Sequence, residues 1–158
     1  MRYVMRLGGL TLLFAILFGI ASVYAASTDA NKDKEHLFVL SGMSGKVEGD
    51  TLTLNNVPSV VYFTDRPDRK TGHIKLQDFL AGWKAQEDSL NNNPPNAVLS
   101  VLDGEGNQNT VVVLQSPTVE GNDISFKIKT LEGTAPKKFK AASLFIDPIN
   151  RAGPWTGT

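Results

Sequence analysis

Short runs in which apolar and polar side chains alternate dominate the chain after residue 35. The run "TLTLN" places Leu52 and Leu54 on one face of a strand. The run "DISFKIKTL" places Ile124, Phe126 and Ile128 together in the same way. A period of two is typical of strands that bury one face and expose the other. The pattern therefore predicts half-buried strands.

Four further runs are apolar on both faces. They are "SVVYF" (59–63), "AVLSVL" (97–102), "TVVVL" (110–114) and "SLFI" (143–146). Such runs favour central strands, or strands packed between two layers. Turn residues separate all of these runs at the spacing of an all-β domain.

Two of the turns are nearly identical in sequence. In "VEGDTLTL" and "VEGNDISF" a Gly-Asp or Gly-Asn pair predicts a two-residue hairpin loop, in which glycine supplies the positive φ. The register then pairs Val47 with Leu52 and Val119 with Ile124. Duplication of a half-domain and convergence on the same turn would both explain the likeness. Convergence is simpler, because the rest of the two halves does not match.

One segment has helical periodicity. In "IKLQDFLAGWKAQEDSL", Leu76, Phe79, Leu80 and Trp83 follow the i, i+3, i+4, i+7 spacing of an amphipathic helix. Pro94 ends the helical segment. We therefore expect an all-β fold: a single antiparallel sandwich or partly closed barrel of about seven to nine strands, with one short helix over an edge or an open end.

The first 25 residues have the pattern of a signal peptide. Arg2 and Arg6 form a basic start, 7–20 is apolar, and small residues precede a cut after Ala25. An uncleaved anchor is the competing interpretation, but the small-residue exit favours cleavage. We expect a soluble mature protein in the periplasm or outside the cell.

The mature chain divides into three parts. Residues 26–35 are polar and predict a flexible lead-in, 36–147 form the β-domain, and 148–158 are expected to be a mobile tail.

Composition excludes several kinds of chemistry. The chain has no cysteine, so disulfides, thiol nucleophiles, thiolate metal sites and lipidated cysteines are ruled out. It carries 16 basic and 16 acidic residues, and removal of the signal peptide makes the balance slightly acidic. We therefore expect no nucleic-acid partner and, after cleavage, no membrane partner.

The catalytic and metal motifs are incomplete. Ser44 in "SGMSGK" approaches a nucleophile elbow, but Lys46 stands where the second glycine is needed, and a turn is the better interpretation. Asp103, Glu105, Asn107 and Asn109 alternate as calcium ligands do, yet the loop lacks the required glycine and closing glutamate. We expect a polar hairpin loop there, and neither a metal nor a cofactor.

The most concentrated polar cluster is "DRPDR", the segment Asp65, Arg66, Pro67, Asp68 and Arg69. It suits a solvated type I turn with the proline at its second position. Alternatively, one of its arginines presents a bidentate fork to an anion, oriented by a neighbouring acid.

Trp83, Asp88 and Asn96 complete the candidate binding site, although a lone tryptophan inside a domain is more often a core anchor. A binding or interaction module without enzymatic activity is the favoured interpretation, and its partner would be an unknown protein, a glycan or a small anionic ligand. The alternatives are a structural envelope component and a small hydrolase using Asp65, Asp68 and Asp88. In the hydrolase, the neighbouring arginines would keep both acids of the cluster ionised and leave no proton donor.

Several stretches resemble those of a known family. "VVYFTDRPDR", the helix with its tryptophan and "EDS", "PPNAVLSVL" and "SLFID" are similar to an uncharacterised family of small exported bacterial β-rich proteins. The resemblance covers most of residues 45–147. It implies an exported bacterial β-domain and brings no activity, ligand or catalytic residue with it.

Overall fold

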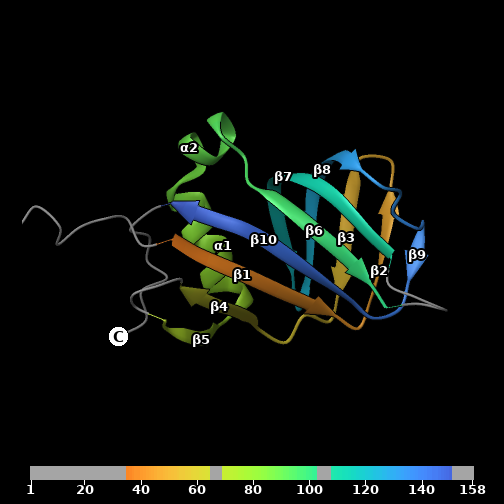
Figure 1. The fold of residues 1–158 in the computed structure, drawn as a ribbon. Coiled ribbons are helices and arrows are strands. Elements are labelled where there is room, and N and C mark those ends of the chain that lie inside the picture. The colour runs from red at the N-terminus through yellow and green to blue at the C-terminus, as the bar shows by residue number, and fades with distance from the viewer. Residues whose placement is uncertain (1–34, 65–68, 103–107, 151–158) are drawn as a thin grey trace, which may run out of the picture. The chain divides into compact units, whose positions relative to one another are not determined.

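The computed structural model describes residues 35–64, 69–102 and 108–150. In this part of the chain, ten strands and two helices are present (Figure 1). They are β1 (Glu35–Gly42), β2 (Ser44–Glu48), β3 (Thr51–Asn55), β4 (Val60–Thr64), β5 (Thr71–Ile74), α1 (Leu76–Ala85), α2 (Glu87–Asn92), β6 (Asn96–Val101), β7 (Gln108–Glu120), β8 (Asp123–Glu132), β9 (Lys138–Phe139) and β10 (Ala142–Asn150).

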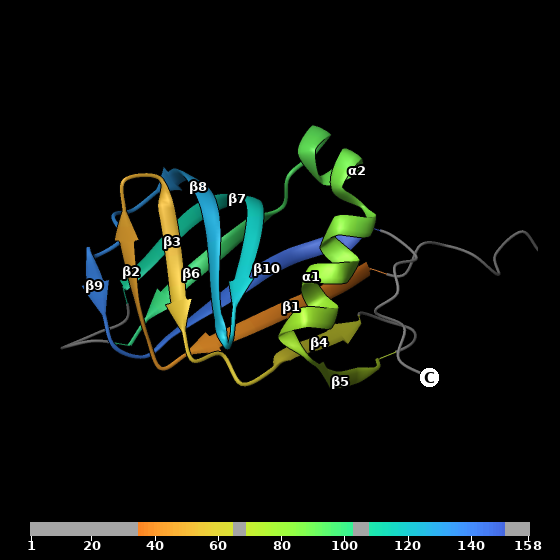
Figure 2. The same cartoon turned by 180° about the vertical axis from the view of Figure 1, so that it is seen from behind.

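All ten strands belong to one antiparallel sheet in the order β5-β4-β1-β10-β6-β7-β8-β3-β2-β9. The sheet folds over, so that β4, β1, β10 and β6 form one layer and β8, β3 and β2 lie opposite (Figures 1 and 2). The predicted all-β fold is confirmed. The strand number exceeds the prediction because β5 and β9, with four and two residues, are too short to show an alternating pattern.

Both predicted hairpins have the expected register. Val47 lies opposite Leu52, and Val119 lies opposite Ile124. The glycine of each turn has a φ close to +60°, a conformation that side chains with a Cβ adopt at a cost.

The predicted helix is divided in two. α1 ends at Ala85, and the backbone N–H of Gln86 donates to the carbonyl oxygen of Trp83 at 3.0 Å. This i to i−3 bond tightens the last turn, after which α2 begins. The apolar side of α1 faces the interior: Phe79 packs against Phe38 of β1, Trp83 packs against Phe126 of β8, and the backbone of the helix approaches β7 (Figure 2).

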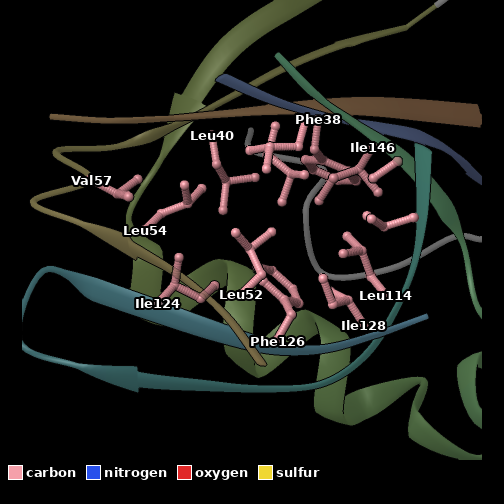
Figure 3. Close-up of a cluster of buried hydrophobic side chains, with 14 of the residues drawn as sticks. Phe38, Leu40, Leu52, Leu54, Val57, Leu114, Ile124, Phe126, Ile128 and Ile146 are labelled. Atoms are coloured by element: carbon pink, nitrogen blue, oxygen red, sulfur yellow. The ribbon is translucent and has the colours of Figure 1, made fainter. Parts of the chain in front are cut away.

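The core lies between the two layers. Side chains from strands of both layers point into a common interior (Figure 3). A chain of neighbouring rings runs from β4 and β1 through α1 to β8, with centroid separations between 5.4 and 6.2 Å; its members are Tyr62, His36, Phe38, Phe79, Trp83 and Phe126.

The last strand extends beyond the predicted end of the domain. Residues 148–150, expected in the tail, belong to β10, and Asn150 pairs with Glu35 of β1. The register shifts between His36 and Phe38, which accommodates Pro148 even though proline cannot donate to the ladder. The sequence pattern did not predict this extension, because proline is rare inside strands.

We expect Phe126→Ala to lower the free energy of unfolding by about 3 to 5 kcal/mol, because the ring is 1% exposed and packs against Trp83. The adjacent Lys127→Ala removes only an exposed ion pair with Asp50, worth about 0 to 1 kcal/mol. Urea denaturation of the two variants tests this. Equal losses would contradict the orientation of β8.

A carboxylate joins the turn between β7 and β8 to the chain leaving β3. Asp123 accepts hydrogen bonds from the backbone N–H of Asn56 and from the side-chain amide of Asn55, both at 2.8 Å. Close by, the backbone N–H of Val57 donates to the carbonyl oxygen of Asn122 at 2.8 Å. The Asn56 N–H, followed by the Asn55 amide, lowers the pKa of the Asp123 carboxyl.

This lowered pKa makes the fold sensitive to acid. The Asp123 carboxylate contributes its full stability above the unfolded pKa of about 3.9, and that contribution is lost as the pH falls through the lower folded pKa. We expect thermal midpoints measured between about pH 6 and pH 2 to fall less steeply for Asp123→Asn than for the parent. Parallel curves would show that this carboxylate adds nothing to the acid sensitivity.

Candidate functional site

The predicted polar cluster is only partly within the described residues. Asp65, Arg66 and Asp68, with the turn at Pro67, lie outside them. Arg69 is described; it is exposed and has a φ of 46°.

The base of this loop is fixed to β4 by two hydrogen bonds. The backbone N–H of Thr64 donates to the carbonyl oxygen of Lys70 at 2.8 Å, and the backbone N–H of Lys70 donates to Thr64 Oγ1 at 2.9 Å. Thr64 is buried, so it ties the segment that follows β4 to the body of the sheet.

The other predicted residues have different environments. Trp83 is 2% exposed and lies between the rings of Phe79 and Phe126, which makes it a core residue. Asp88, on α2, and Asn96, the first residue of β6, are both exposed.

The structure brings some of these residues to one end of the sheet. Two strands, β1 and β10, separate β4 from β6. Thr64, just before the loop, pairs with His36 of β1, which pairs with Ile149 of β10, and Ala97, next to Asn96, pairs with Ile146 of β10. The end of β4 and the start of β6 are therefore three strand spacings apart, about 14 Å. Asn96 and the base of the loop lie along one rim, too far apart to contact the same atom. Of the three carboxylates in the hydrolase hypothesis, only Asp88 is described.

The remaining candidates show no assembled catalytic or metal centre in the described part of the chain. Met43 forms the bend between β1 and β2, which is the turn predicted around Ser44. His36 is buried beside Phe38, and His73 Nδ1 lies 3.2 Å from Ser59 Oγ.

The described residues contain no group of three or more His, Cys, Asp or Glu residues suited to a metal ion. Of the candidate calcium ligands, Asp103, Glu105 and Asn107 lie outside them, and Asn109 is an exposed residue of β7. None of the described helices has the length and apolar character needed to cross a membrane.

One polar side chain that the sequence did not single out is Gln86, at the junction of α1 and α2. Its Oε1 and Nε2 atoms are buried and have no hydrogen-bond partner among the described groups. A buried polar group without a partner costs about 1 to 3 kcal/mol.

We expect Gln86→Met to raise the free energy of unfolding by about 1 kcal/mol, because it keeps the length of the side chain and removes both polar atoms. Gln115→Met, at an exposed position of β7, is the matched control and should change stability by less than about 0.5 kcal/mol. Chemical denaturation measures both. A clear loss of stability in Gln86→Met would mean that the amide is needed for the fold.

An uninterrupted apolar row crosses the outer face of β4, β1, β10 and β6 and continues onto the part of β7 that pairs with β6. Val61 of β4 pairs with Val39 of β1, and Val39 pairs with Phe145 of β10. Phe145 pairs with Val98 of β6, which pairs with Val111 of β7. These five residues, the outer row, cross five neighbouring strands on the side away from the core. Phe145 is 46% exposed, and the valines are half-buried.

Further apolar residues extend this surface on one side of the row. Leu37 pairs with Phe63, which is 38% exposed, and Val113 follows Val111 on β7. With the outer row they define the outer apolar face, which consists of Leu37, Val39, Val61, Phe63, Val98, Val111, Val113 and Phe145. Figure 1 looks onto the strands that carry it.

Polar residues border the outer row on its other side. Ser41 and Ser143 lie side by side, with their hydroxyl oxygens 3.0 Å apart, and Ser100 and Asn109 continue this line. On the side of Leu37 and Val113, the central strands carry exposed Asp147, two residues after Phe145, and exposed Asn96, which pairs with Val113. The row itself contains no charged residue, and polar residues lie on both of its sides.

The runs that are apolar on both sides predicted central strands or strands packed between two layers. They correspond to β4, β6, β7 and β10, and each of these strands has a neighbour on both sides in the sheet. The described residues cover only their inner side.

Comparison of the chain with protein-family models, with curated proteins and with solved structures gives no match. The resemblance to a family of exported bacterial proteins therefore stays an expectation.

Proposed function

We propose that the chain is an exported module without enzymatic activity that binds a protein through the outer apolar face. The observation that carries this proposal is the outer row, five apolar side chains in register across five strands. Contiguous exposed apolar patches with a polar border mark protein interaction sites. Export is supported by the basic start, apolar run and small-residue exit of the first 25 residues.

The chemistry of the face favours a partner with an apolar, uncharged surface. The row consists of β-branched side chains and one aromatic ring, which lose little conformational entropy on binding. The hydroxyls of Ser41, Ser143 and Ser100 can bond to polar groups at the border of such a partner. A small anionic ligand would find no cation within the row.

Photo-crosslinking in the exporting cell tests this function. A benzophenone derivative of phenylalanine at position 145 should form an adduct with a protein. The same derivative at Met43, which is 67% exposed and lies at the bend after β1, should not.

Formation of the adduct should also require an intact outer apolar face. A charge introduced by Val98→Asp, next to Phe145, should abolish it, because the charge would have to be desolvated in the interface. Thr118→Asp, an exposed position on the polar end of β7, should leave it unchanged. Absence of any protein adduct at position 145 would overturn the proposed function.

A further inference from the structure

We infer that the partner of the outer apolar face is the same face of a second copy of this chain, so that two sheets stack around a two-fold axis. The inference rests on the proposed function, because it uses the same surface.

The outer row is suited to two-fold symmetry. Across the sheet its residues are Val61, Val39, Phe145, Val98 and Val111, so the row is apolar along its whole length and can lie against its own copy. A two-fold interface apposes one surface patch with itself. With the axis at the centre of the row, Phe145 packs against the partner's Phe145 and every valine meets a valine. Because the row is uncharged, no like charges are brought together there.

The border residues select the direction of the axis. An axis along β10 would place the exposed carboxylate of Asp147 opposite its own copy, and two facing carboxylates repel each other. An axis that runs across the strands reverses β10 in the second copy. Asp147 then faces the partner's Ser143, whose hydroxyl can donate to the carboxylate. We assign this second orientation, in which Val39 also faces the partner's Val39.

The edges of the sheet are poorly suited to association, so a second copy would bind through the face of the sheet. The edge strand β5 has four residues, and Lys70 and Lys75 flank it. The other edge strand, β9, has two residues and includes Lys138. Short edges bearing lysine discourage pairing between sheets.

The size of the face indicates a weak dimer. Five strands at a spacing of about 4.8 Å, each with three outward residues about 6.7 Å apart, give a flat area of about 500 Å² per copy when the polar residues beside the apolar ones are included. The total of about 1,000 Å² is at the lower limit for a specific interface and below the usual 1,200 to 2,000 Å². We therefore expect the dimer to depend on concentration in the micromolar range.

Site-directed crosslinking tests the arrangement, because the chain has no cysteine of its own. Phe145→Cys and Val39→Cys should each give a dimer with a bis-maleimide that spans about 10 Å, the distance between stacked sheets. Met43→Cys, outside the face, should stay monomeric.

A pair of variants tests the axis. Val61→Cys protein alone should crosslink, because Val61 faces its own copy in the assigned orientation. Linkage only in a mixture of Val61→Cys and Val111→Cys protein, the pair that an axis along β10 would bring together, would overturn this orientation.

Sedimentation of the purified protein between about 1 and 500 µM should show the mass doubling, and Val98→Asp should hold it at the monomer mass with an unchanged circular dichroism spectrum. A monomer at all concentrations, without a crosslink from position 145, would overturn the second copy as partner. In that case a photo-adduct of position 145 with a different protein would leave the proposed function standing. Absence of both would overturn the two together.

Discussion

The packing of α1 against both layers is the interaction on which the rest of the structure depends. Phe79 lies 5.4 Å from Phe38 of β1, and Trp83 lies 5.9 Å from Phe126 of β8, measured between ring centroids. A folded-over sheet with unpaired end strands leaves part of its inner face open to water. The helix covers this part with two large aromatic side chains, which contribute more buried area than any aliphatic pair. The two layers are thus joined by a continuous set of rings as well as by the sheet itself.

Because α1 and the opposite layer cover the inner face of the sheet, the inward side chains of each strand are enough to form the core. Leu144 and Ile146 of β10 point inward and are fully or almost fully buried, while Phe145 between them points outward. The inward residues, with α1 and the opposite layer, complete the core. The outer row adds no contact to this interior. Its valines favour extended strands and pair with their neighbours, but Phe145 leaves a large apolar side chain 46% exposed. The proposed association with a second surface would remove this ring from water.

The sequence was informative wherever a local pattern determines the structure. Alternation predicted the buried face of β8, the paired glycine turns fixed two hairpin registers, and the spacing of Phe79 and Trp83 located α1. Residues 148–150 were missed because proline interrupts the pattern of a strand. Strand order, and the placement of Arg69 and Asn96 along one rim of the sheet, depend on pairings between distant segments, which no local pattern encodes. Trp83 was a candidate binding residue although a tryptophan inside a domain is more often a core anchor, and its packing between Phe79 and Phe126 places it in the core.

The two halves of the outer surface differ in a way that folding does not require. On the half formed by β8, β3 and β2, the hydroxyl oxygens of Thr53 and Ser125 lie 2.9 Å apart, and Lys127 pairs with Asp50 at 2.7 Å. Both halves belong to one sheet and pack on the same core. The half with polar residues on its outer side is folded like the other, so the fold tolerates polar residues there. Serine, threonine or lysine at the position of Phe145 would therefore be compatible with β10. An apolar residue at that position, in register with valines on both sides, is best explained by a contact outside the fold.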